Sequence, residues 1–104
     1  MENSVAIITG ASQGIGRSTA IRLARDFSAL VLVARDRANL EGTAEAVKAA
    51  GAKALVIDSD LSQPEAAKSV VDQVLAAFDR IDALLNIAGA VPQIDLFEDR
   101  KSVV

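Results

Sequence analysis

The sequence predicts an α/β fold in which helices cover a parallel sheet, and two observations carry this prediction. Four short runs have the length of strands and are apolar throughout rather than alternating: 5–9, 29–34, 54–57 and 83–87. Longer segments with helical spacing separate these runs. Continuously apolar strands indicate burial on both faces, and strands separated by helices form parallel sheets with right-handed crossovers. The predicted order is therefore β-α-β-α-β-α-β.

The intervening helices each repeat apolar residues on one face. In the segment 14–27 the apolar face includes Ile15, Leu23 and Phe27. In 38–50 it includes Leu40, Ala44 and Val47. In 63–78 it includes Val70, Val74 and Phe78. A capping box of Ser62 and Glu65, with Pro64 in the first turn, is expected to start the third helix. The pattern stops after Gly89, so we expect one unit over residues 1–89 and a weakly determined tail over 90–104.

Composition narrows the classes of protein and partner. The chain has 104 residues and a net charge of −3, without a visible basic patch, so nucleic acid is not an expected partner. It contains no Cys and no His, which excludes disulfides and thiolate metal sites and removes the commonest general base. Neither a signal peptide nor an apolar run of ~20 residues is visible. We expect a soluble, cytoplasmic protein without a membrane partner.

A glycine-rich stretch, T-G-A-S-Q-G-I-G at 9–16, follows the first strand directly and precedes a helix. Glycines there allow an anion to approach the backbone amides, and the helix N-terminus adds unpaired N–H groups, so we favour phosphate binding over a turn that binds nothing. A mononucleotide P-loop is excluded, because Ile15 stands five residues after Gly10 and no Lys follows. The common dinucleotide fingerprint also fails, because Thr19 occupies its third glycine position.

The observed spacing, Thr-Gly-x-x-x-Gly-x-Gly, resembles the cofactor loop of the short-chain dehydrogenases/reductases, in their compact-spacing type. Three further stretches match that family: 33–36 after the second strand, 58–61 after the third, and 86–89, which is similar to an Asn-Asn-Ala-Gly motif with Ile87 in place of the second Asn. The resemblance covers residue 5 to about 97. It implies a Rossmann-type, doubly wound parallel sheet, truncated after the fourth strand.

The resemblance implies a dinucleotide site where the strands end. The glycines allow an anion to approach the backbone closely, and the residues between them face the pyrophosphate and ribose. Asp60 and Leu61 flank the adenine. The stretch 86–89 lies beside the ribose. The predicted residues are Gly10, Ser12, Gln13, Gly14, Ile15, Gly16, Arg35, Asp60, Leu61, Asn86, Ala88 and Gly89. Structural alternatives are that Asp60 only satisfies turn amides and that the side chain of Asn86 ties the fourth strand to its neighbour.

Arg35 bears on which dinucleotide is bound. An acid at the end of the second strand binds the ribose 2′-hydroxyl of NAD, whereas an Arg accommodates the 2′-phosphate of NADP. Arg35 takes this place in the resemblance, while Asp36 is expected to cap the next helix and Arg37 adds positive charge. The sequence therefore favours NADP over NAD.

The chemistry that the resemblance implies is hydride transfer between a nicotinamide and a carbonyl or alcohol, with Ser, Tyr and Lys as catalytic residues. The sequence contains no Tyr, so no catalytic residue is assigned, and we expect the chain to be incompetent alone. The stretch 99–104 does not continue the family pattern, which fits a truncated product. The alternatives are a non-enzymatic nucleotide-binding module, a module that self-associates or complements a full-length relative through an open fourth strand, and a product without function. A methyltransferase is a weaker competitor, because Arg35 does not suit a sulfonium ligand.

Overall fold

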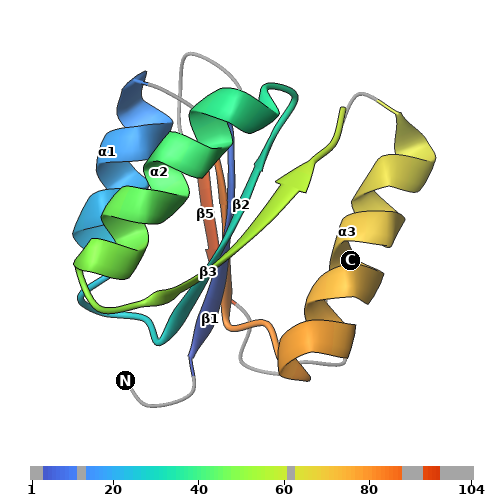
Figure 1. Cartoon of the computed structure of the whole chain (residues 1–104). Helices are drawn as coiled ribbons and strands as arrows, with labels where there is room; N and C mark the ends of the chain where they lie inside the picture. Colours follow the sequence, from blue (N-terminus) through green and yellow to red (C-terminus); the bar gives the residue numbers. More distant parts are fainter. Residues whose placement is uncertain (1–3, 12–13, 61–62, 88–92, 97–104) are drawn as a thin grey trace.

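The computed structural model describes residues 4–11, 14–60, 63–87 and 93–96, which form a doubly wound α/β fold (Figure 1). The strands are β1 (Val5–Thr9), β2 (Ala29–Ala34), β3 (Lys53–Asp58), β4 (Ala83–Asn86) and β5 (Gln93–Leu96). The helices are α1 (Gly14–Leu23), α2 (Arg37–Ala49) and α3 (Pro64–Phe78). The predicted alternation of strands and helices is confirmed through β4.

The sheet has the order β3-β2-β1-β4-β5, with the first four strands parallel and β5 antiparallel to β4. The prediction of an open fourth strand is wrong, because Asn86 pairs with Gln93 and Ala83 with Leu96 across the two strands. Strand β5 lies within the segment 90–104, where the sequence pattern was too weak to place an element. The sequence of β5, Q-I-D-L, lacks the continuous apolar run that located the other strands, so its pairing with β4 rather than its own pattern defines it. The division at residue 89 stays a prediction.

Helices cover both faces of the sheet: α1 and α2 lie on one face and α3 lies on the other (Figure 1). Successive residues of β1 point to opposite faces, so Ala6 and Ile8 join the core beneath α1 and α2, whereas Val5 and Ile7 join the core beneath α3. This burial on both sides explains why apolar residues follow one another along the interior of β1 instead of alternating with polar ones.

The helix ends follow their local sequences. Asp36 caps α2 as expected: its Oδ1 accepts the backbone N–H of Asn39 at 3.1 Å. The predicted N-cap of α3 at Ser62 is wrong, because Gln63 is the N-cap and forms no side-chain cap hydrogen bond. Ser62 lies outside the described residues, so its predicted hydrogen bond with Glu65 is untested. Pro64 explains the difference: it occupies the first helical position and keeps the residue before it extended, which makes Gln63 the cap.

The amino ends of β1 and β4 are joined by Asp82. Its carboxylate accepts the backbone N–H of Val5 at 2.8 Å and the Nε–H of Arg80 at 2.8 Å. The hydrogen bond from the guanidinium to Asp82 raises the pKa of Arg80. This contact fixes the register of β4 beside β1 at the end of the sheet opposite to the glycine-rich turn.

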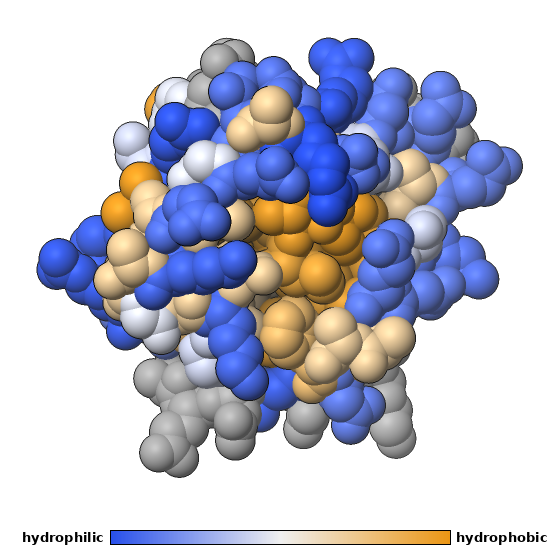
Figure 2. All heavy atoms as spheres, in the orientation of Figure 1, coloured by the Kyte–Doolittle hydropathy of each residue, from blue (hydrophilic) through white to orange (hydrophobic). Residues whose placement is uncertain are grey.

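One face of the molecule shows hydrophobic side chains gathered at its centre, over the part of the view where strand β3 lies between α2 and α3 (Figures 1 and 2). Strand β3 is an edge strand, and its residues Ala54, Leu55 and Val56 are only half-buried. Within the described part of the chain, no helix is both long and apolar enough to cross a membrane.

Candidate functional site

The described residues of the predicted site gather at the carboxyl edge of the sheet. The glycine-rich turn follows β1, Arg35 follows β2, Asp60 follows β3 and Asn86 ends β4. Because β1 to β4 are parallel and adjacent, these four ends lie along one edge. Strand β1 has β2 on one side and β4 on the other, so the chain reverses its winding direction there. Ligands of open α/β sheets bind outside the strand ends at such a point.

The three glycines of the turn are required for two different structural reasons. Gly10 and Gly14 have φ angles of +67° and +60°, a conformation that other residues adopt at a cost. A Cβ on Gly14 would meet nothing within 4 Å, so its requirement is conformational. A Cβ on Gly16 would lie 1.8 Å from the carbonyl oxygen of Gly10, so its requirement is close packing of α1 on the turn. The close packing at Gly16 is the helix packing that the sequence predicts, whereas the approach of an anion to the backbone stays a prediction.

The first turn of α1 is open to solvent. Gly14 and Ile15 are exposed, and the Ile15 side chain is 61% exposed although it is apolar. The first N–H groups of a helix lack intrahelical partners and attract anions. No acidic side chain lies in this first turn to compete for them. Among the described residues, the site therefore presents an exposed first turn of α1 that includes an exposed apolar side chain.

Thr9, which the sequence analysis did not assign to the site, connects β1 to β4. Its hydroxyl donates to Oδ1 of Asn86 at 2.9 Å and accepts the backbone N–H of Ile87 at 3.1 Å. The structural role considered for Asn86, tying the fourth strand to its neighbour, is thus present. The sequence does contain a signal for this role. Thr9 is a hydroxyl residue at the end of an otherwise apolar strand, and a buried hydroxyl requires a hydrogen-bond partner.

A second network fixes the glycine-rich turn from the side of α2. The hydroxyl of Thr43, which is fully buried, donates to the carbonyl of Ala11 at 2.9 Å. Arg17 donates from Nε to that hydroxyl and from its Nη2 to the carbonyl of Asn39, both at 2.9 Å. Gly42 leaves room for this guanidinium, since a Cβ there would lie 3.2 Å from Nη2. The sequence analysis missed Arg17 and Thr43, because no motif marks a contact between separate helices.

Two arginines with different surroundings follow β2: Arg35 lies in the turn, and Arg37 is the first residue of α2. Arg35 is exposed and forms no ion pair with any residue that the structure describes. Arg37 pairs with Glu41 at 3.5 Å and with Asp58 at 3.2 Å. Arg35 is therefore the cation of this turn that is available to a ligand.

The remaining predicted residues divide into one that is described and five that are not. Asp60 is half-buried just beyond β3, and its carbonyl accepts the N–H of Gln63 at 3.1 Å. Its predicted contact with adenine stays a prediction. The other five lie outside the described residues, so their predicted roles are untested: Ser12, Gln13, Leu61, Ala88 and Gly89.

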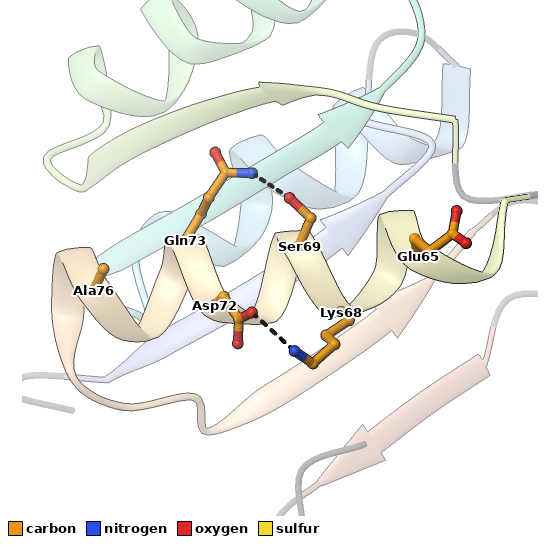
Figure 3. A pocket seen from close by; sticks show the side chains of 6 residues that line it. All are labelled: Glu65, Lys68, Ser69, Asp72, Gln73 and Ala76. Carbon is orange, nitrogen blue, oxygen red and sulfur yellow. Dashed lines mark hydrogen bonds and ion pairs between the residues drawn. The ribbon is translucent and has the colours of Figure 1, made fainter.

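A separate shallow hollow lies along α3, lined by Glu65, Lys68, Ser69, Asp72, Gln73 and Ala76 (Figure 3). Its side chains pair with one another: Lys68 with Asp72 at 3.7 Å, and Gln73 with Ser69 at 3.1 Å. It contains none of the predicted cofactor-binding residues. Among the described residues, no group of three or more acidic side chains is placed to hold a metal ion.

Together these features define a class of protein: doubly wound α/β proteins with a glycine-rich turn and an open helix N-terminus at the point where the winding reverses. Residues 4–102 match the short chain dehydrogenase family, and the chain belongs to that family. The chain spans 36% to 39% of the length of the first three curated relatives that it matches.

Relatives and solved structures agree with this assignment. The chain is 37% identical over 99 residues to 1,6-dihydroxycyclohexa-2,4-diene-1-carboxylate dehydrogenase of Acinetobacter baylyi, covering 94% of this chain and 37% of the relative. A metagenomic short-chain oxidoreductase in complex with NADP superposes with a TM-score of 0.76 at 38% identity, over 81% of this chain and 38% of that one. NAD+-bound xylitol dehydrogenase superposes with a TM-score of 0.73 at 35% identity, over 77% of this chain and 31% of that one.

Proposed function

We propose that the chain is the NADP(H)-binding part of a short-chain oxidoreductase. The observation that carries the proposal is the glycine-rich turn, in which Gly16 packs against the Gly10 carbonyl and leaves the N-terminus of α1 open. The pyrophosphate would lie against these amides, and Arg35 would face the ribose 2′-phosphate. Neighbouring structures with NADP and with NAD support a dinucleotide, and Arg35, which has no ion-pair partner in the described part of the chain, favours NADP.

The reaction of the whole enzyme would be hydride transfer between a nicotinamide and a carbonyl or alcohol, for which the bound dinucleotide supplies or accepts the hydride. The residues described here would bind and orient that cofactor. The chain contains no Tyr, so we propose that it performs no turnover by itself. Cofactor-dependent carbonyl reduction by the pure chain would overturn this part of the proposal.

Titration of the purified chain with NADPH, followed by nicotinamide fluorescence, tests cofactor binding. We expect saturable binding that NADP displaces better than NAD. Replacing Arg35 with Ala should reduce this preference by on the order of tenfold, since a hydrogen bond to a charged group contributes about 1.5 kcal/mol. Arg25→Ala is the matched control, because Arg25 is also exposed and lies beyond the far end of α1. An unchanged preference in Arg35→Ala would remove Arg35 from the proposal, and absence of binding would remove the cofactor.

A module that associates with a second copy or with a full-length relative is the second candidate. The half-buried apolar residues of the edge strand β3 favour it (Figure 2), because an edge strand presents unpaired backbone groups to another chain. Size-exclusion chromatography of the chain alone and mixed with a full-length relative tests this candidate. A monomer in both experiments would exclude it.

A further inference from the structure

The ion pair between Arg37 and Asp58 links the start of α2 to the end of β3. The Nη1 of Arg37 lies 3.2 Å from Oδ1 of Asp58, and the same guanidinium contacts Glu41 at 3.5 Å. Both side chains of the Arg37–Asp58 pair are about half exposed, at 53% and 52%. An exposed pair of this kind is weak, so a stronger anion can replace its carboxylate.

Asp58 lies directly beside the turn after β2, which contains Arg35 and is proposed to contact the ribose. It is the Cα partner of Ala34 in the parallel ladder, and Arg35 follows Ala34 in the chain. The ladder continues past this pair, since the N–H of Ser59 donates to the carbonyl of Ala34 at 2.9 Å. Neighbouring strands lie ~4.8 Å apart, which brings the Asp58 charge next to Arg35 and Arg37.

The two arginines therefore differ in their availability to a 2′-phosphate. Arg35 has no ion-pair partner among the described residues, whereas Arg37 is held by carboxylates on β3 and α2. A 2′-phosphate carries more negative charge than a carboxylate and forms stronger hydrogen bonds with guanidinium groups. A 2′-hydroxyl is neutral and does not compete for Arg37. The Arg37–Asp58 pair consequently responds to the one group by which NADP differs from NAD.

We propose that Asp58 is a specificity-determining residue that weakens the preference for NADP, an inference that rests on the proposed function. It does so in two ways: it holds Arg37 toward β3, and it places a negative charge beside the 2′ position. Asp58 acts partly through Arg37 and is in that respect a positioning residue. Removing its charge should release Arg37 to a 2′-phosphate and leave binding of NAD nearly unchanged.

The test measures dissociation constants for NADPH and NADH in wild type, Asp58→Asn, Arg37→Gln and the double variant. We expect Asp58→Asn to raise the ratio of the NADH constant to the NADPH constant by about fivefold, the scale of a partly solvated charge–charge interaction. Arg37→Gln should lower this ratio, and most of the gain from Asp58→Asn should disappear in the double variant. Asp58→Ser repeats the charge removal with a different side chain.

Glu45→Gln is the matched control, because it removes one negative charge from an exposed position of α2 and Glu45 forms no ion pair with Arg37. It should change the ratio by less than about twofold. A ratio in Asp58→Asn and Asp58→Ser that equals that of wild type, when wild type binds both cofactors, overturns this inference alone. Absence of saturable binding by wild type overturns the proposed function, and this inference with it.

Discussion

The two faces of the sheet differ in what their helices contribute. On one face α1 and α2 bury Ala20, Leu40 and Val47, whereas on the other face the buried side chains of α3 among the described residues are Val70 and Val74. The face with two helices also contains the hydrogen bonds that connect α2 to the glycine-rich turn. The conformation of the candidate site therefore depends more on the packing of α1 and α2 than on α3.

Replacing Gly16 with Ala should have the largest effect on this comparison. The new Cβ would overlap the carbonyl of Gly10 and push α1 from the turn, so we expect a loss of about 3 kcal/mol in the free energy of unfolding and loss of NADPH binding. Gly14→Ala is the control, because its Cβ has open space and only the positive φ is penalised, by about 1 kcal/mol. Urea unfolding measures both. Equal losses would show that the close packing of α1 does not matter.

Thr43→Val tests the polar connection between α2 and the turn. The substitution keeps the shape but removes the hydroxyl that Ala11 and Arg17 use, so we expect a loss of about 2 kcal/mol in unfolding free energy and weaker NADPH binding. Thr43→Ser retains the hydroxyl and should recover most of the binding. If Thr43→Val bound NADPH as tightly as wild type, the turn would not depend on α2.

Val47→Ala and Val74→Ala compare the two faces with the same chemical change, because both side chains are fully buried. We expect a loss of about 2 kcal/mol for Val47, between α2 and the sheet, and about 1 kcal/mol for Val74, since α3 packs alone and can move into the cavity. Urea unfolding of both variants gives the difference directly. A larger loss for Val74 would reverse the comparison.

Asp79→Gly should have the smallest effect and the opposite sign. Asp79 ends α3 with a φ of +61°, and its carboxylate stands at the negative end of the helix dipole. Glycine adopts this conformation without cost, so we expect α3 to gain about 0.5–1 kcal/mol. A rise of a few degrees in the melting temperature would support this expectation. A fall would mean that the Asp79 side chain stabilises the end of α3.

The sequence was sufficient for the parts of the fold that local patterns define. The interiors of strands β1 to β4 are continuously apolar because helices cover both faces, and the glycine spacing located the turn before any contact was known. It was not sufficient for β5, which depends on pairing with β4, or for the N-cap of α3, where Pro64 moved the boundary.

Within the candidate site, the residues that sequence analysis found are those that belong to motifs. Thr43 belongs to no motif, and Thr9 begins the glycine-rich motif but was assigned no role in the site. Their importance comes from partners 32 and 77 residues away, Ala11 and Asn86. The different surroundings of Arg35 and Arg37 could not be predicted either. They depend on where the end of β3 lies beside the end of β2.

The central position of β1 has a consequence for the order in which the chain folds. Val5 of β1 pairs with Ala29 of β2, and Ala6 of β1 pairs with Ala83 of β4. The first pairing closes a much shorter stretch of chain than the second. The entropy of closing a loop rises with its length, and non-local pairings form slowly. During synthesis β1, α1 and β2 can therefore assemble before β4 leaves the ribosome. The hydrogen bond between Thr9 and Asn86 would then form after β1 and β2 have paired, so the side of the site formed by β4 would form after the side formed by β2.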